Sequence, residues 1–371
     1  MNSVRMFGPL GSASGYANAV RNFALAFSKS EIPTKFHFGQ KAEAEYSLFM
    51  ESLKRYSGDT NIDFYLHGPP WSTHRSRAYK IGYFYWEADR LPLSWERMIS
   101  QVNELWVPCQ LVEQACRKAK FKGPIKLIPT PSDPWETNQR LIIPSDVSNQ
   151  YIVSDDVFKF YSIFQWHERK GYKELLQAYY KTFNEDDNVI LILKVNPLNI
   201  RGYTRDKIKV DIMEIKRRLN QKYFPRVYLS RDILNVSHIQ ALHNTADCYV
   251  SAHHGEGWGV PIHDAMLAEN HLIVPKFGGV TDYLDENSAN LVDFKIGPVS
   301  GMEWSNLYGS YQNWAYPGVN SLSQKMREVF DNPLHYYPKT IKAKEIAETM
   351  TTSAVARLIN KELIIPRKSN A

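Results

Sequence analysis

The residues best suited to ligand chemistry are concentrated in segment 251–266, SAHHGEGWGVPIHDAM. Every second residue from Gly255 to Gly259 is a glycine, so this backbone can bend sharply and present free N–H groups to a ligand. Two carboxylates, Glu256 and Asp264, stand with seven residues between them. Carboxylates accept hydrogen bonds strongly, so the pair suits two sets of hydroxyl groups on one ligand, as a sugar offers. The plainer interpretation is an acidic helix start that complements the helix dipole.

A second candidate is the basic turn in segment 158–183, FKFYSIFQWHERKGYKELLQAYYKTF. The pattern predicts a strand, then the turn with Arg169 and Lys170, then a helix whose apolar residues follow helical spacing. Cations at a strand-to-helix turn suit an anionic ligand. The alternative is a solvated Arg-Lys pair before a helix.

The first segment resembles the E-x7-E signature of the retaining glycosyltransferases of family 4, usually E-G-F-G-x-P-x-x-E-A-M followed by a strand and G-G. Here it reads E-G-W-G-V-P-I-H-D-A-M, with Gly278-Gly279 downstream. Trp258 replaces the usual Phe, and Asp264 replaces the second Glu with a side chain one methylene shorter. The resemblance implies that Glu256 positions the donor sugar and Asp264 the ribose, with Gly257, Trp258 and Gly259 completing the donor loop.

The R-K-G turn is similar to the family's motif in which a lysine reaches the donor diphosphate, which makes Lys170 the expected diphosphate cation. Family members often carry an Arg a few residues earlier, where this chain has Phe164 and Gln165. Arg169 is the nearest substitute for that second cation. In relatives a backbone loop holds the nucleotide base, and the resemblance places that loop at residues 230–234, ending at Leu234.

The N-terminal half resembles the family mainly in layout. Gly11 and Gly15, in GPLGSASGYANAVRNF, lie where relatives have a glycine-rich loop near the diphosphate and the acceptor. Many relatives have a cleft histidine that touches the donor sugar, and here Glu87 or Asp89 stands in its place. We expect Glu87 to make the sugar or acceptor contact.

The resemblance implies that a hexose moves with retention from a GDP-mannose or UDP-glucose type donor to a glycan or other hydroxyl acceptor. The route is front-face, with no metal and no covalent nucleophile, because Lys170 and backbone N–H groups supply the positive charge. The alternative is a weakened or inactive relative that serves as a sugar- or nucleotide-binding module, since Phe164, Asp264 and Glu87 depart from the common pattern. A dehydrogenase or an epimerase is disfavoured because G-P-L-G-S-A-S-G does not match G-x-G-x-x-G.

The elements that must position these residues alternate between short apolar runs and longer amphipathic stretches, typical of parallel strands joined by crossover helices. Strands are expected near 3–7, 34–38, 62–65, 80–85, 104–107, 125–128, 158–164, 189–195, 227–229, 248–251 and 272–275. Helices are expected near 15–30, 43–55, 94–102, 110–120, 173–183, 207–222, 236–245, 261–268, 322–330 and 341–363.

The fold class is therefore α/β. Segment 129–156 holds four prolines and no helical period, which indicates a linker between an N-terminal domain, 1–150, and a C-terminal domain, 151–345. The resemblance implies the GT-B fold, with two Rossmann-like domains facing across a cleft, an acceptor domain and then a donor domain. The pattern does not say which domain the last helix packs on; a return of about 346–371 to the N-terminal domain is one option.

The composition bounds the remaining choices. The 371 residues are 43% hydrophobic and 23% charged, enough for two cores and too apolar for a disordered chain. A net charge of +6 is too small an excess to indicate a nucleic-acid groove, so we expect no nucleic-acid partner and at most peripheral membrane contact. Three cysteines without C-x-x-C spacing, and no apolar run near the ~18 residues of a membrane span, favour a cytoplasmic protein without a metal site.

Overall fold

The computed structural model describes residues 2–11, 15–71, 77–135, 156–196, 205–231 and 234–364. The chain divides into two compact units. The first unit comprises Met1–Pro134, Glu256–Val260 and Ala347–Ala371, and the second comprises Trp135–Gly255 and Pro261–Ile346. Most of the predicted linker lies outside the described residues.

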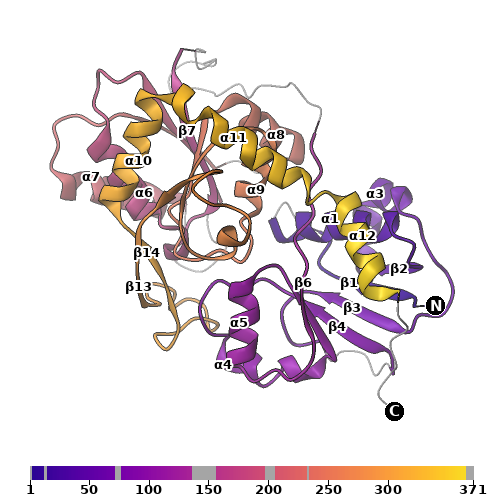
Figure 1. Cartoon of the computed structure of the whole chain (residues 1–371). Coiled ribbons are helices and arrows are strands. Elements are labelled where there is room, and N and C mark those ends of the chain that lie inside the picture. The colour runs from indigo at the N-terminus through magenta and orange to yellow at the C-terminus, as the bar shows by residue number, and fades with distance from the viewer. Residues whose placement is uncertain are drawn as a thin grey trace. The chain divides into compact units, whose positions relative to one another are not determined.

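The first unit is built on a six-stranded sheet in the order β2-β1-β3-β4-β5-β6, with every pair parallel (Figure 1). Its strands are β1 (Val4–Phe7), β2 (Thr34–His37), β3 (Ile62–Leu66), β4 (Tyr79–Tyr83), β5 (Glu104–Val107) and β6 (Ile125–Leu127). Its helices are α1 (Gly15–Lys29), α2 (Gln40–Glu45), α3 (Ser47–Ser52), α4 (Leu93–Glu96), the short 3₁₀ turn η1 (Ile99–Gln101), α5 (Gln110–Lys118) and α12 (Thr352–Leu363).

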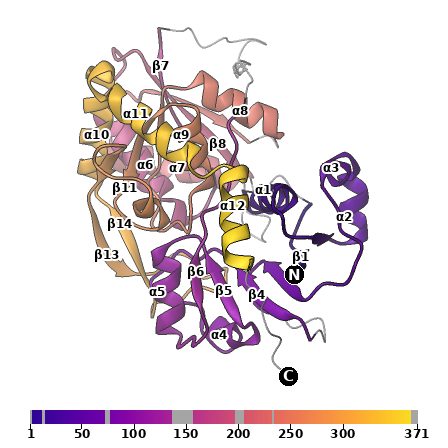
Figure 2. The same cartoon turned by 45° about the vertical axis from the view of Figure 1, so that its right-hand side comes forward.

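The C-terminal helix belongs to the core of this first unit. Helix α12 packs against α1, and the two helices lie side by side in both cartoon views (Figure 2). Val355, Ile359 and Leu363 are fully buried and join the core beneath the sheet. The Asn2 side chain also donates to the Leu363 carbonyl oxygen at 2.7 Å. The last described helix therefore completes an N-terminal core, although it lies more than 300 residues away in sequence.

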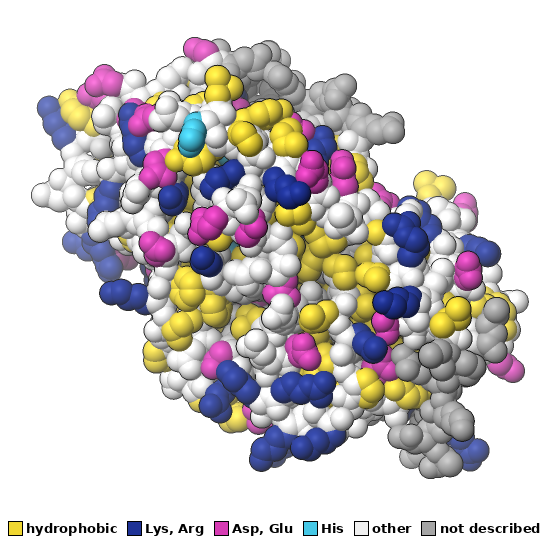
Figure 3. Space-filling view, viewed as in Figure 1, with side chains coloured by type: hydrophobic (Ala, Val, Ile, Leu, Met, Phe, Trp, Pro, Cys, Tyr) yellow, Lys and Arg dark blue, Asp and Glu magenta, His cyan; other side chains and the backbone are white. Residues whose placement is uncertain are grey.

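The second unit repeats the plan with a sheet in the order β12-β11-β10-β7-β8-β9, again all parallel. The strands are β7 (Phe158–Gln165), β8 (Val189–Asn196), β9 (Arg226–Ser230), β10 (Cys248–Val250), β11 (His271–Pro275) and β12 (Asn290–Val292). The helices are η2 (Glu168–Lys170), α6 (Tyr172–Thr182), α7 (Arg205–Leu219), α8 (Val236–Thr245), α9 (Val260–Leu267), η3 (Gly279–Asp282), α10 (Val319–Asp331) and α11 (Pro333–Glu348). Figure 3 shows Lys and Arg interspersed with Asp and Glu on one face of the molecule.

Three predicted helices are each divided in the structure. The stretch 94–102 forms α4 and the 3₁₀ turn η1, with Arg97 and Met98 between them. The stretch 43–55 forms α2 and α3, because the backbone leaves the helical conformation at Tyr46. The stretch 341–363 forms the end of α11 and then α12, because the Thr351 side chain caps α12 by accepting from the Ala354 N–H at 3.2 Å. The prediction of continuous helices was wrong at all three places, since helical spacing alone carries no signal for such a break.

A small antiparallel hairpin was not predicted at all. Strands β13 (Phe294–Pro298) and β14 (Asn313–Pro317) pair from Phe294↔Pro317 to Pro298↔Asn313. Strand β13 is largely exposed and reads FKIGP, so it lacks the apolar alternation that marks a strand. Strand β12 was missed as well, because it is only three residues long. Among the described residues, no helix has both the length and the apolar character to cross a membrane.

Candidate functional site

The R-K-G turn and the G-E-G-W-G loop emerge at the same edge of the second sheet. Strands β7 and β10 are parallel neighbours, with Phe160 opposite Cys248 and Tyr161 opposite Tyr249. The turn η2 follows β7 and the loop 251–259 follows β10. Because parallel neighbours share a carboxyl edge, both segments lie where ligands bind in open α/β sheets.

Gly171, the glycine of R-K-G, sits where no other residue fits easily. Its φ is +62°, in the left-handed region, and it is the N-cap residue directly before helix α6. A Cβ added there would lie 1.7 Å from the Ala252 carbonyl oxygen. The turn and the loop therefore meet backbone to backbone at this glycine, which fixes how the basic turn lies against the glycine-rich loop.

Arg169 joins the same two segments through hydrogen bonds. The His254 N–H donates to the Arg169 carbonyl oxygen at 2.7 Å, and the Arg169 guanidinium Nη1 donates to the Gly255 carbonyl oxygen at 2.8 Å. Lys170 and Glu256 follow directly in sequence on the two sides of this junction, and both are partly exposed. The structure thus brings together the segments that carry the predicted diphosphate cation and the predicted donor-sugar carboxylate.

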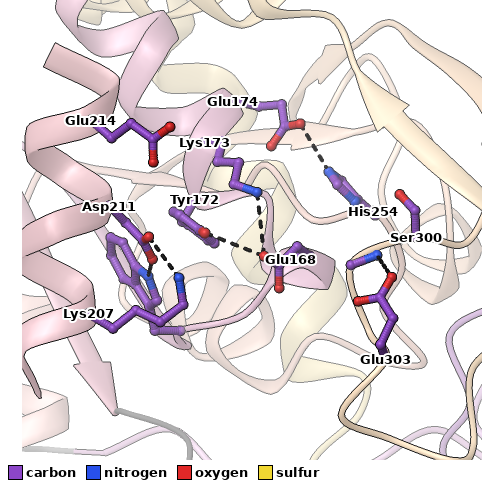
Figure 4. A network of polar contacts seen from close by, with 12 residues as sticks. Glu168, Tyr172, Lys173, Glu174, Lys207, Asp211, Glu214, His254, Ser300 and Glu303 are labelled. Carbon is purple, nitrogen blue, oxygen red and sulfur yellow. Dashed lines mark hydrogen bonds and ion pairs between the residues drawn. The ribbon is translucent and has the colours of Figure 1, made fainter. Parts of the chain in front are cut away.

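Glu174 extends the junction and was not singled out in the sequence. The Glu174 carboxylate on α6 lies 3.4 Å from the His254 Nε2, as Figure 4 shows. Burial alone would raise the pKa of Glu174, but His254, the backbone N–H of Glu174 itself and Lys173 together lower the pKa below its ordinary value. This contact could not be predicted, because a glutamate in the first turn of a predicted helix is already explained by its favourable interaction with the helix dipole.

The unpredicted hairpin also contacts the loop. The Ala315 N–H of β14 donates to the His254 carbonyl oxygen at 2.8 Å. The ring of His254 packs on Trp314 and Tyr316, with ring centroids 5.1 and 4.8 Å apart, and His254 is only 4% exposed. His254 is thus enclosed by α6 on one side and by the hairpin on the other.

His253 holds the loop to the segment that carries the double glycine. Its Nδ1 is 2.9 Å from the Ser251 Oγ and its Nε2 is 3.0 Å from the Phe277 carbonyl oxygen. A carbonyl can only accept, so Nε2 carries the proton, and in a neutral ring Nδ1 then accepts from the serine hydroxyl. Phe277 directly precedes Gly278-Gly279, where Gly278 has a φ of +93°. His253 is fully buried and ties the two glycine-rich turns together.

The remaining donor-loop residues have well-defined places. Trp258 is buried, with 3% of its surface exposed, and Gly259 has a φ of +84° immediately before α9. Pro261 is the second residue of α9, a position that a proline tolerates because the first N–H groups of a helix have no partner within it. Asp264 is half-buried on α9. Burial is the main cause that raises the pKa of Tyr161, and the nearby Tyr249 and Asp264 raise this pKa further. Leu234 is half-buried directly before α8, whose cap is Asn235.

The place of the family's second cation is occupied by apolar core. Phe164 is 8% exposed and stacks against Trp166, with ring centroids 5.8 Å apart. Gln165, the last residue of β7, is exposed. Lys194 on the neighbouring strand is 3% exposed, and its Nζ donates to the Asn196 side-chain oxygen at 2.6 Å.

The first unit brings its own candidate residues together. Gly15 begins α1, and the next residue, Tyr16, packs edge-on against Tyr85 with ring centroids 5.2 Å apart. Burial, Tyr85 and the Glu87 carboxylate all raise the pKa of Tyr16, so Glu87 lies near the start of α1. Gly11, which follows β1 by four residues, is exposed. The predicted glycine-rich loop and Glu87 therefore share the carboxyl edge of the first sheet.

No cluster of three His, Cys, Asp or Glu side chains suited to a metal ion occurs in the part of the chain that the structure describes.

Solved structures share this fold over nearly the whole chain. Anabaena HepE in complex with UDP and glucose matches with a TM-score of 0.65 at 12% identity, covering 98% of this chain and 100% of HepE. Trehalose-6-phosphate synthase OtsA matches with a TM-score of 0.67 at 10% identity, covering 99% and 100%. A glycosyltransferase from Rickettsia africae matches with a TM-score of 0.63 at 12% identity, covering 99% of each chain.

No protein-family model and no curated protein matches the sequence. At 10 to 12% identity, the likeness to solved structures concerns the fold. The predicted fold class is confirmed: with two Rossmann-like units on six-stranded parallel sheets, the chain has the α/β fold of the GT-B glycosyltransferases.

Proposed function

We propose that this protein is a retaining glycosyltransferase, related to family 4, that transfers a hexose from a nucleotide-sugar to a hydroxyl acceptor. One observation carries the proposal: the R-K-G turn and the G-E-G-W-G loop are joined by the two hydrogen bonds of Arg169 at the carboxyl edge of one sheet. That edge supplies, within one backbone junction, a cation for a diphosphate and a carboxylate for a sugar.

The carboxyl edge of the second sheet is the proposed donor site. Lys170 neutralises the diphosphate, and the backbone N–H groups of the loop assist it, so that no divalent metal is needed. Glu256 accepts hydrogen bonds from the sugar hydroxyls and Asp264 accepts from the ribose. Leu234 contributes apolar surface, and the buried Trp258 forms part of the donor loop. The first unit is the proposed acceptor domain, and Gly11, Gly15 and Glu87 are its proposed ligand-binding residues.

UDP-glucose is the favoured donor over GDP-mannose. The support is that the HepE structures contain UDP, UDP with glucose, or UDP-glucose, on the same fold. Lys170 acts on the diphosphate that both donors share, so the choice between uridine and guanosine depends on the loop that ends at Leu234.

The transfer step is balanced without a covalent intermediate. The bond from the anomeric carbon to the diphosphate oxygen breaks as the bond to the acceptor oxygen forms on the same face. The acceptor proton passes to the leaving diphosphate oxygen. Lys170 stabilises the negative charge that develops on that oxygen, which is where electrostatic assistance has most effect.

Donor turnover tests this function. The protein is incubated with UDP-glucose or GDP-mannose in EDTA and a panel of sugar acceptors, and nucleoside diphosphate release and the anomeric configuration of the product are followed. We expect an α-linked product from an α-linked donor and, for Glu256→Gln, turnover lower by at least about 100-fold, the scale of losing one transition-state contact. An inverted product would refute retention. Tight binding without turnover in any acceptor arm would identify a binding module instead.

A further inference from the structure

We infer that Arg169 is a positioning residue that clamps the Glu256 loop, and not the second diphosphate ligand that its sequence position suggests. The inference rests on the proposed donor site and concerns how that site is held. The clamp consists of Arg169, the Glu174–His254 pair and the Ala315 N–H of β14.

The hydrogen-bond geometry of Arg169 is directed at the loop. Its carbonyl oxygen accepts from His254 and its Nη1 donates to Gly255, so one residue holds two successive residues of the loop from both its backbone and its side chain. Together the two bonds fix the position and direction of the peptide that leads into Glu256. The guanidinium has five N–H donors, and the 2.8 Å bond directs one of them at the loop backbone.

Two further contacts restrain His254 from other directions. The Glu174 carboxylate approaches the His254 ring at 3.4 Å, and the Ala315 N–H donates to the His254 carbonyl oxygen at 2.8 Å. Helix α6, turn η2 and strand β14 thus converge on His254, which is 4% exposed. Three separate segments restraining one buried loop residue is the arrangement expected where a neighbouring side chain must be held within a fraction of an ångström.

The consequence is a division of labour within R-K-G. Lys170 acts on the diphosphate, Gly171 allows the close approach to Ala252, and Arg169 orients the loop. Loss of Arg169 should therefore leave diphosphate affinity in place and reduce the rate of the chemical step. Loss of Lys170 should reduce diphosphate affinity itself.

The test compares Arg169→Met, which keeps the aliphatic stem, with Lys170→Met as the matched variant. Calorimetry with UDP measures diphosphate affinity, and UDP release from UDP-glucose gives kcat and KM. For Arg169→Met we expect UDP affinity within about 3-fold of wild type and kcat lower by roughly 10- to 100-fold, the equivalent of a lost charge-assisted hydrogen bond. Arg169→Lys, which can still donate one hydrogen bond, should recover part of kcat.

Hydrogen exchange supplies a readout that needs no ligand. In Arg169→Met, and to a smaller degree in Glu174→Gln, the amides of 254–257 should exchange faster while β7 and α6 keep their protection. UDP affinity of Arg169→Met weakened as much as that of Lys170→Met would overturn the inference and restore Arg169 as a phosphate ligand. Unchanged loop exchange in both variants would also overturn it. If wild type binds no UDP, the donor proposal fails, and the exchange experiment still decides whether the clamp exists.

Discussion

At the scale of single residues, the candidate site depends on backbone approaches that a side chain would prevent. Gly171 and Gly278 have positive φ values, and both stand in motifs that could be recognised in the sequence, R-K-G and G-G. Both glycines could therefore be predicted to lie in tight turns. The contacts of Arg169 with Gly255 and of Glu174 with His254 could not be predicted, because they join segments about 80 residues apart in sequence.

Replacing Gly171 with alanine tests this tight approach. The new Cβ would meet the Ala252 carbonyl and the backbone would be strained at a φ of +62°, so we expect the free energy of unfolding to fall by at least about 3 kcal/mol, from overpacking and left-handed strain together. Urea denaturation measures the change.

Gly39 is the matched control, because its φ is +89° with no atom near the added Cβ. Gly39→Ala should lose only the backbone strain of its φ of +89° and ψ of +136°, about 1 to 3 kcal/mol. Equal losses in the two variants would show that the close approach to Ala252 has no energetic weight.

At the scale of elements, helix α12 is held to the rest of the first unit by polar contacts at its N-terminal end and by apolar packing along its length. Asp133 accepts from the Thr352 N–H at 2.7 Å, the Thr352 hydroxyl at 2.6 Å and the Lys29 Nζ at 3.2 Å. The helical pattern of α12 could be predicted, but its docking site could not, because an amphipathic helix fits either apolar sheet. The missed hairpin is the opposite case. Its strand β13 pairs with β14, but β13 is largely exposed and its sequence lacks the apolar alternation of a strand.

The Asp133 contacts predict that the packing of α12 on the first unit becomes less stable in acid. Burial alone would raise the pKa of Asp133, but the hydrogen bonds from Thr352 and Lys29 lower the pKa below its ordinary value. A lowered pKa in the folded state gives stability that is present above the unfolded value of about 3.9 and is lost as the pH falls through the folded value. The Asp133 side chain is 37% exposed, which weakens its ion pair through solvent screening. Asp133→Asn should thus be less stable than wild type by roughly 0.5 to 1 kcal/mol at pH 7, and the difference should narrow below about pH 4.

Thermal unfolding across pH 3 to 7 measures that difference. Glu345→Gln, at an exposed pair with Lys342, is the control and should change stability by a few tenths of a kcal/mol at most. A gap between Asp133→Asn and wild type that stays constant down to pH 3 would contradict the assigned role of the carboxylate.

At the scale of the whole molecule, the chain has two hydrophobic cores, each around its own parallel sheet. Alternating strand and helix patterns predicted both sheets, because buried parallel strands are continuous apolar runs. The strand orders could not be read from the sequence, since they depend on which crossovers pack on which face. The return of α12 to the first core likewise depends on tertiary packing and not on local pattern.

Two buried side chains test whether the cores are separate. Ile359 on α12 belongs to the first core and Leu176 on α6 to the second, and both are fully buried. Each alanine variant should lose about 2 to 5 kcal/mol, the usual cost of such a truncation in a core. Hydrogen exchange should show lost protection in β1 and β3 for Ile359→Ala and in β7 and β8 for Leu176→Ala. Equal loss across both sheets in either variant would show a single cooperative core.

The most direct test of the central claim, that the edge of the second sheet is a nucleotide-sugar site, is a calorimetric titration of the protein with UDP in EDTA. The account predicts saturable binding, weakened by on the order of 10- to 100-fold in Lys170→Ala, the scale of a charge-assisted contact. Lys222→Ala, at an exposed lysine beyond α7, should bind as wild type does. Binding that is absent, or that Lys170→Ala leaves unchanged, would contradict the account.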